Sequence, residues 1–144
     1  MDARHFFTDS EKALILNAIC EAENETSGEI RVHVSEHCPS GELDAAAYWF
    51  DKLLMHKTKE RNGVLFYLAI KDRRFAIIGD AGINSRVPTD FWDSISALIQ
   101  SRFVEGRFAD GLAEGIRMAG SQLKEHFPRQ ADDVNELPDE ISFS

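Results

Sequence analysis

Two apolar runs, Val64–Ile70 and Phe75–Ile78, stand close together near the middle of the chain. Uninterrupted runs of this length, rich in β-branched and aromatic residues, are typical of strands buried on both faces. The charged link Lys71–Arg73 is short enough to join them as a hairpin. The second run ends in Gly79-Asp80-Ala81-Gly82-Ile83-Asn84, where two glycines and two oxygen-bearing side chains predict a polar loop. We therefore expect a buried central hairpin that opens into a loop.

A different pattern covers Glu29 to Ser35, where Ile30, Val32 and Val34 alternate with polar residues. Strict alternation predicts a strand with one poorly covered face. The sequence therefore predicts an outer position for this strand in the sheet.

Apolar residues at helical spacing predict the remaining elements. A capping box at Thr8 and Glu11 predicts the start of the first helix. The four expected helices run from this cap to about Asn24, over Asp44–Met55, from Thr89-Asp90 to Gly106, and from Phe108 to Phe127.

The order of these elements is helix, strand, helix, strand, strand, helix, helix. A right-handed crossover makes the first two strands parallel, and the hairpin adds an antiparallel strand. We expect an α/β fold: a three-layer α/β/α sandwich whose central mixed sheet is flanked by about four helices. Residues 1–128 form this domain. Residues 129–144 form an acidic tail, either solvated or held in extended form through Leu137, Ile141 and Phe143.

The chain has 144 residues and a formal net charge of −9. This balance argues against a nucleic-acid partner, because phosphate binding needs a basic surface. The N-terminal segment lacks the basic-then-apolar layout of a signal peptide, and no apolar stretch approaches the roughly 20 residues of a membrane helix. We expect a cytoplasmic protein without direct membrane insertion.

The predicted topology gathers oxygen-bearing side chains at one end of the sheet. These are Glu29 and Asn62 at strand starts, Asp80 and Asn84 after the hairpin, and Asp90 at a helix start. Hard cations such as calcium take carboxylate, amide and carbonyl oxygens as ligands. Strings such as Asp80-x-Gly82-x-Asn84 are mostly turns, but their convergence with the two other carboxylates predicts a divalent-cation site.

The opposite end of the sheet collects His33, His37 and Cys38. In an extended strand the two histidines would lie about 13 Å apart, at about 3.3 Å per residue, which argues against shared zinc. The sequence also contains no phosphate-binding glycine loop and no GxSxG nucleophile motif. No catalytic residue is predicted from these patterns.

Three stretches carry a family resemblance: SGEIRVHV, RNGVLFYLAIKDRRFAIIGDAGIN and FVEGRFADGLAEGI. In order and spacing they resemble the TPM domain family, which includes the thylakoid lumen protein, over about Phe7 to Phe127. The closing NELPDEISF resembles the ending of short bacterial members. The positions that match the family motif are Glu29, Asn62, Gly63, Gly79, Gly82 and Asp90, and Asp80 stands where many members carry tyrosine.

The resemblance implies an α/β sandwich and two kinds of function. Some members bind calcium, and others serve the repair or assembly of membrane complexes or modify a receptor. This implies a divalent-cation module, with calcium or alternatively magnesium at Glu29, Asp80, Asn84 and Asp90, that contacts a protein partner associated with a membrane. A plant member has been assigned acid phosphatase activity, which implies a metal-dependent phosphomonoesterase as the alternative.

Overall fold

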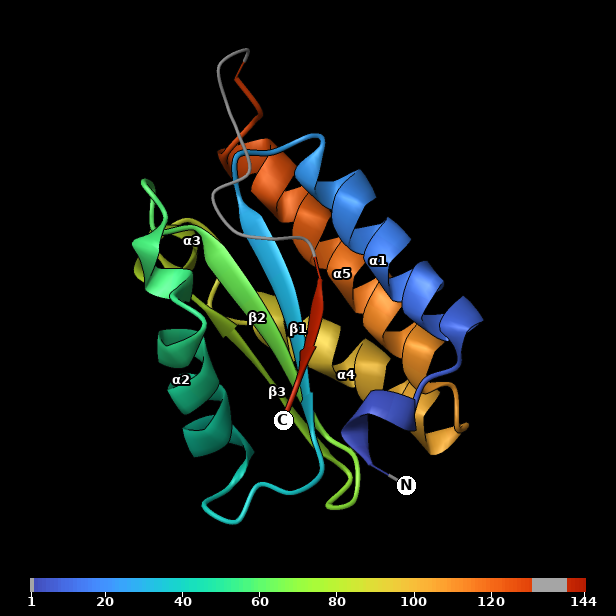
Figure 1. Ribbon diagram of the computed structural model, residues 1–144. Coiled ribbons are helices and arrows are strands. Elements are labelled where there is room, and N and C mark those ends of the chain that lie inside the picture. The colour runs from blue at the N-terminus through green and yellow to red at the C-terminus, as the bar shows by residue number, and fades with distance from the viewer. Residues whose placement is uncertain (1, 131–139) are drawn as a thin grey trace.

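A four-stranded sheet lies between two layers of helices, with α2 on one face and α1, α4 and α5 on the other (Figure 1). This computed structural model describes residues 2–130 and 140–144. The described residues form the helices α1 (Asp9–Glu23), α2 (Glu42–Lys52), α3 (Ala81–Asn84), α4 (Phe91–Val104) and α5 (Phe108–His126), the short 3-10 helices Ala3–His5 and Met55–Lys57, and the strands β1 (Glu29–Ser35), β2 (Gly63–Ala69), β3 (Arg74–Gly79) and β4 (Ile141–Phe143). The predicted α/β sandwich is confirmed.

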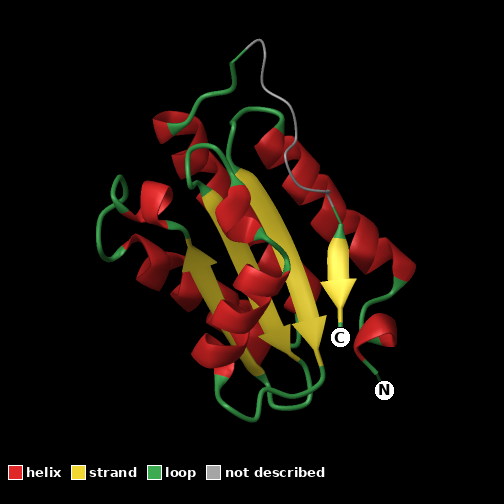
Figure 2. Cartoon of the chain, turned by 60° about the vertical axis from the view of Figure 1, so that its left-hand side comes forward, coloured by secondary structure: helices red, strands yellow, loops and turns green. Residues whose placement is uncertain are grey.

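The strand order is β3-β2-β1-β4. Strands β1 and β2 are parallel, from Glu29 opposite Gly63 to Ser35 opposite Ala69, and β2 and β3 form the predicted antiparallel hairpin. The predicted outer position of β1 is wrong. Strand β4 pairs in parallel with its free side, as Figure 2 shows, so β1 is an interior strand.

The sheet has an apolar face and a mixed face. On the apolar face Val32, Phe66 and Leu68 lie in the main core with the inner sides of α1, α4 and α5. On the mixed face Leu65 and Tyr67 pack against α2 and the 3-10 helix that follows it. All seven residues of β1 and all seven of β2 are buried, so these two strands form the centre of the domain.

The predicted helix start at Thr8 is confirmed. The Glu11 N–H donates to the Thr8 hydroxyl at 3.1 Å, and the Thr8 N–H donates to the Glu11 carboxylate at 2.9 Å. The predicted polar loop after β3 is partly wrong, because Asp80 begins the one-turn helix α3 there. Residue Asp90 directly precedes α4, and its side chain makes no capping hydrogen bond.

Residues Ile141–Phe143 join the sheet as β4. Ile141 and Phe143 pack against the main core, as expected for anchors of an extended tail. The third expected anchor, Leu137, lies outside the described residues.

Candidate functional site

Three oxygen-bearing side chains, Glu29, Asn62 and Asp80, lie at the end of the sheet where β1 and β2 begin and β3 ends. Their exposed fractions are 2%, 1% and 7%. The Glu29 N–H donates to the Asn62 carbonyl at 3.4 Å, and the Asp80 N–H donates to the Gly63 carbonyl at 2.9 Å. The predicted convergence of these three residues is confirmed at the level of the backbone.

Residue Gly63 lies between Glu29 and Asp80 in the sheet register. It pairs with Glu29 in the parallel ladder, and Asp80 continues β3 on its other side. Residues directly opposite each other share one face of a sheet, so Glu29 and Asp80 flank the bare Cα of Gly63 on that face. A Cβ on Gly63 would lie 2.8 Å from the Met55 carbonyl oxygen. Met55 therefore covers Gly63 with its carbonyl oxygen and with its side chain, whose Cε would lie 3.4 Å from the same Cβ.

The amide of Asn62 contributes a further oxygen. Its Nδ2 donates to the Ser27 hydroxyl at 3.2 Å and to the Glu60 carboxylate at 3.4 Å. Its Oδ1 is buried and accepts no hydrogen bond from the described residues. A buried acceptor without a donor costs about 1–3 kcal/mol. This oxygen retains its capacity to bind a cation or water.

The carboxylate of Asp80 is paired with Arg61. The Arg61 Nε and Nη2 donate to Asp80 Oδ2 and Oδ1 at 2.7 and 2.8 Å, and the Ala81 N–H donates to Oδ1 at 2.8 Å. These hydrogen bonds, and then the opposite charge, raise the pKa of Arg61. The Arg61 side chain is 52% exposed, and its guanidinium covers the buried Asp80 from the solvent side.

The glycine in Asp80-x-Gly82-x-Asn84 has a packing role. A Cβ on Gly82 would lie 2.1 Å from the Glu60 carbonyl oxygen, and the Gly82 N–H donates to the Arg61 carbonyl at 2.8 Å. Only glycine lets α3 approach the segment before β2 this closely. The motif therefore fixes Asp80 beside Arg61 by backbone contact.

Two predicted ligands lie apart from this arrangement. The Asn84 side chain is exposed; its Nδ2 donates to the Gly79 carbonyl at 2.7 Å and its Oδ1 accepts from the Trp92 indole at 2.8 Å. Residue Asp90 is exposed at the start of α4. The Asn84 side chain thus links β3 to α4, and neither residue joins the row of Glu29, Gly63 and Asp80.

Within residues 2–130 and 140–144, no three His, Cys, Asp or Glu side chains form a group able to hold a metal ion. The structure thus does not assemble Glu29, Asp80 and Asp90 as three ligands, and metal binding stays a prediction. What it does bring together is the backbones of Glu29, Asn62 and Asp80, with the Met55 carbonyl next to Gly63. Sequence reasoning missed Arg61 and the Met55 carbonyl, and only the position of Arg61 directly before Asn62-Gly63 pointed to this end.

At the carboxyl ends of the parallel strands β1 and β2, the polar side chains are hydrogen-bonded to one another or to the backbone. Asp72 accepts from the Cys38 N–H at 2.7 Å and bonds His37 Nδ1 at 2.8 Å, contacts that lower the pKa of Asp72 to about 2. Burial, and then Asp72, raises the pKa of the Cys38 thiol, so it is not an activated nucleophile. The hydroxyls of Ser35 and Tyr67 bond each other.

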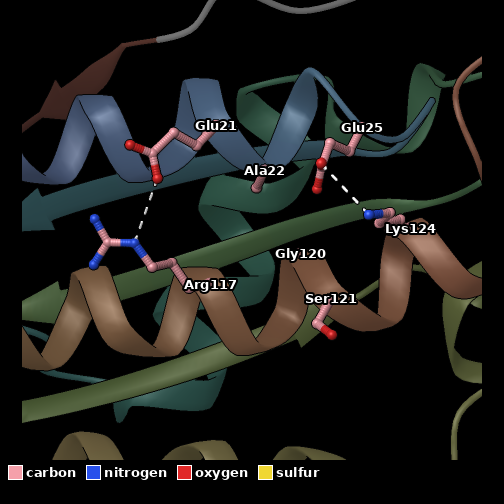
Figure 3. A pocket seen from close by; sticks show the side chains of 7 residues that line it. All are labelled: Glu21, Ala22, Glu25, Arg117, Gly120, Ser121 and Lys124. Carbon is pink, nitrogen blue, oxygen red and sulfur yellow. Dashed lines mark ion pairs between the residues drawn. The ribbon is translucent and has the colours of Figure 1, made fainter.

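A shallow groove between α1 and α5 carries charged side chains on its rim (Figure 3). Arg117 pairs with Glu21 at 3.6 Å, and Lys124 pairs with Glu25 at 3.5 Å. Each cation of the groove thus has an acidic partner across it. The groove offers no unbalanced charge to a ligand.

Comparisons with family models and with solved structures give matches that cover most of the chain. The TPM domain family model matches residues 1–122. The NMR structure of the BA42 protein from the psychrophilic bacterium Bizionia argentinensis is similar over 97% of each chain, with 45% identity and a TM-score of 0.91. No curated protein matches the chain.

Two more distant structures share the fold. The N-terminal domain of cg2496 from Corynebacterium glutamicum is 14% identical, with a TM-score of 0.64 over 82% of this chain and 74% of that one. The N-terminal domain of a P. gingivalis protein is 19% identical, with a TM-score of 0.66 over 88% and 83% of the two chains.

Among the described helices, none combines the length and the apolar character that spanning a membrane requires.

Proposed function

The chain belongs to the TPM domain family, and from this premise we propose that it is a divalent-cation-binding module, with calcium as the preferred ion, that acts in contacts between proteins. The observation that carries the proposal is the row Glu29, Gly63, Asp80. Two buried carboxylates flank a residue without a side chain, and the Met55 carbonyl stands over it. Carboxylates, amides and carbonyls are the ligands of calcium and magnesium.

The buried Asn62 Oδ1 supports the choice of ligand. A buried amide oxygen that accepts nothing from the described residues suits a hard cation better than an anion. With two carboxylates and two neutral oxygens, the rest of the coordination sphere falls to water. Such a low ligand charge places the expected affinity among weak calcium modules, at about 10⁻⁴–10⁻³ M.

In the arrangement described, Arg61 occupies both oxygens of Asp80. A divalent ion that binds Asp80 must displace this guanidinium. Because the Arg61 side chain is half exposed, it can turn to solvent at little cost. Arg61 thus acts as an internal competitor of the ion.

The protein-contact part of the proposal is supported by large apolar side chains on the surface. Leu43 and Tyr48 on α2 are 66% and 57% exposed, and Leu54, after α2, is 49% exposed. Leu54 directly precedes Met55, whose carbonyl stands over Gly63. Ion binding at the strand ends would therefore order the segment next to this surface.

Melting curves with calcium and with chelator test the ion. An ion that binds only the native state stabilises it by about 2.7 kcal/mol at a hundredfold excess over Kd, which raises the Tm of a domain of this size by roughly 5–15 °C. Asp80→Asn should remove most of this rise. Arg61→Gln should keep or enlarge it, because the competing cation is gone.

Asp90→Asn is the matched control, since it removes an exposed carboxylate outside the row. We expect it to retain most of the calcium effect. A complete loss with Asp90→Asn would instead favour the full set Glu29, Asp80, Asn84 and Asp90. A wild-type Tm indifferent to about 10 mM calcium, roughly ten to a hundred times the expected Kd, would end the proposal.

The alternative is a metal-dependent phosphomonoesterase. It requires turnover of p-nitrophenyl phosphate that needs calcium or magnesium, stops with chelator and is lost in Asp80→Asn. We expect no turnover above the buffer rate.

A further inference from the structure

Strand β4 covers the edge of β1 that the rest of the domain leaves open. It pairs Ile141, Ser142 and Phe143 with Val32, His33 and Val34. Nearer the start of β1 a side chain takes this role, because the Ile30 N–H donates to Glu23 Oε2 at 2.7 Å. An uncovered edge of aliphatic residues pairs readily with other strands. Without β4, this edge of β1 would be open to pairing with another strand.

The edge selects its strand by charge. Arg31 Nη2 donates to Glu140 Oε1 at 2.7 Å; the Arg31 side chain is 7% exposed and that of Glu140 is 58% exposed. The Arg31 Nε is buried and donates to no described residue. A buried guanidinium without an anion would be costly. A strand on this edge therefore needs a carboxylate opposite Arg31.

The edge also selects hydroxyls. The two ring nitrogens of His33 bond the Ser142 and Ser144 hydroxyls at 2.6 and 3.0 Å, and the ring stacks on Trp49 with centroids 3.9 Å apart. A hydroxyl can donate or accept, so both nitrogens of a neutral imidazole are satisfied. A strand with apolar residues in place of Ser142 and Ser144 would leave both ring nitrogens of His33 without these partners.

A third requirement is an aromatic ring on the apolar side. The Phe143 ring packs against the main core, with Lys12 and Arg4 at 5.4 and 5.8 Å from its centroid. These distances allow cation–π attraction. Together the edge reads the pattern acid, aliphatic, hydroxyl, aromatic, hydroxyl, which is the sequence of Glu140 to Ser144.

We propose that the edge of β1 is a strand-acceptor site that also takes β4 from a second copy of this chain, so that two copies exchange their last strands. Every contact of β4 with β1 is made by the segment itself, so a second copy's strand makes the same contacts. Exchange of an identical element is a low-cost route to a dimer.

The monomer and the strand-exchanged dimer differ mainly in whether β4 comes from the same chain or from the other chain. Within one chain the strand is covalently joined to its acceptor, and partners joined in this way have effective concentrations of about millimolar order. Because the contacts are the same, the exchanged dimer should dissociate with a Kd of similar size. The wild-type chain is then mainly monomeric at micromolar concentration, and dimers form as it approaches about 1 mM.

Exchanging charges between two variants tests the site directly. In Arg31→Glu and in Glu140→Arg the chain's own strand meets a like charge. When the two variants are mixed, each strand finds an opposite charge on the other chain. We expect dimers in the mixture at about a tenfold lower concentration than in either variant alone, measured by sedimentation equilibrium, since a tenfold change needs only 1.4 kcal/mol.

The double variant Arg31→Glu/Glu140→Arg is the control, because it restores the pair within one chain and should behave like the wild type. If circular dichroism shows all variants folded and the mixture dimerises no more than its components, the proposal is wrong. Should Arg31→Glu not fold, a concentration series of wild type and Phe143→Asp decides. Dimers near 1 mM that Phe143→Asp suppresses support exchange, whereas dimers unaffected by it, or none, overturn exchange.

Discussion

The two faces of strand β1, in the middle of the sheet, are both buried but carry different residues. On the face covered by α1, α4 and α5, strand β1 presents Ile30, Val32 and Val34, each at most 2% exposed. On the opposite face the same strand presents the polar residues Glu29, Arg31, His33 and Ser35, each at most 6% exposed.

The difference separates stability from binding. Apolar side chains on the first face contribute through removal of their surface from water. Polar groups on the second face cost free energy unless each finds a partner. The partners found, such as Glu140 for Arg31 and Tyr67 for Ser35, come from β4 and from β2. Both proposals concern this face because partners of this kind can be exchanged for an ion or for another strand.

The largest expected effect compares two leucines of β2 on opposite faces, Leu68 at 1% and Leu65 at 0% exposure. Leu68→Ala should cost about 3–5 kcal/mol, because the sheet and three helices around it cannot collapse into the cavity. Leu65→Ala should cost about 2–3 kcal/mol, because the flexible Met55 side chain in its small cluster can fill space.

Urea unfolding of both variants measures this pair. A cost for Leu68→Ala below about 1 kcal/mol would contradict its central position in the main core. A larger loss for Leu65→Ala than for Leu68→Ala would reverse the assignment of the two faces.

The sequence predicted the elements of the apolar face well, because their patterns are local. Continuous apolar runs marked β2 and β3 to within one residue at each end. The interior position of β1 could not be read in this way. Arg31 and His33 suggested an exposed face because their partners, Glu140 and Ser142, lie 109 residues further along the chain.

The candidate site divides in the same manner. Strand direction alone placed Glu29, Asn62 and Asp80 at one end of the sheet. The pairing of Asp80 with Arg61 and the position of the Met55 carbonyl depend on side-chain rotamers and loop geometry, which leave no periodic signal. Prediction from sequence therefore reached the strand end but not its inner arrangement.

Lowering the pH should reduce the free energy of unfolding through His33, a buried residue on the polar face of the sheet. Burial, and after it the charge of Arg31, lowers the pKa of His33 to about 4, against about 6.5 in the unfolded chain. Between these values the unfolded chain binds more protons, so stability is lost as pH falls from about 6.5 to about 4. For this group the loss amounts to about 3 kcal/mol.

The matched variant is His33→Gln, which does not titrate. The other groups that titrate in this range are common to both proteins, so the difference between their stability curves isolates His33. We expect the loss between pH 7 and pH 4.5 to be about 2–3 kcal/mol smaller in the variant. Parallel curves would mean that His33 is protonated as easily in the folded state as in the unfolded one.

The smallest expected effect lies on the outer side of the helices that cover the apolar face. Arg117 and Lys124 pair with acids across the α1–α5 groove at 3.6 and 3.5 Å, but all four side chains are about half exposed or more. Exposed pairs gain little, so Arg117→Ala and Lys124→Ala should each change the free energy of unfolding by under about 0.5 kcal/mol. The neighbouring Gly120→Ala is the contrast, because its Cβ would lie 2.6 Å from that of Ala22 and force the helices apart, at about 1–3 kcal/mol. A cost above about 1 kcal/mol for either charge variant would show that surface charges, besides the close packing of Gly120 on Ala22, hold α1 against α5.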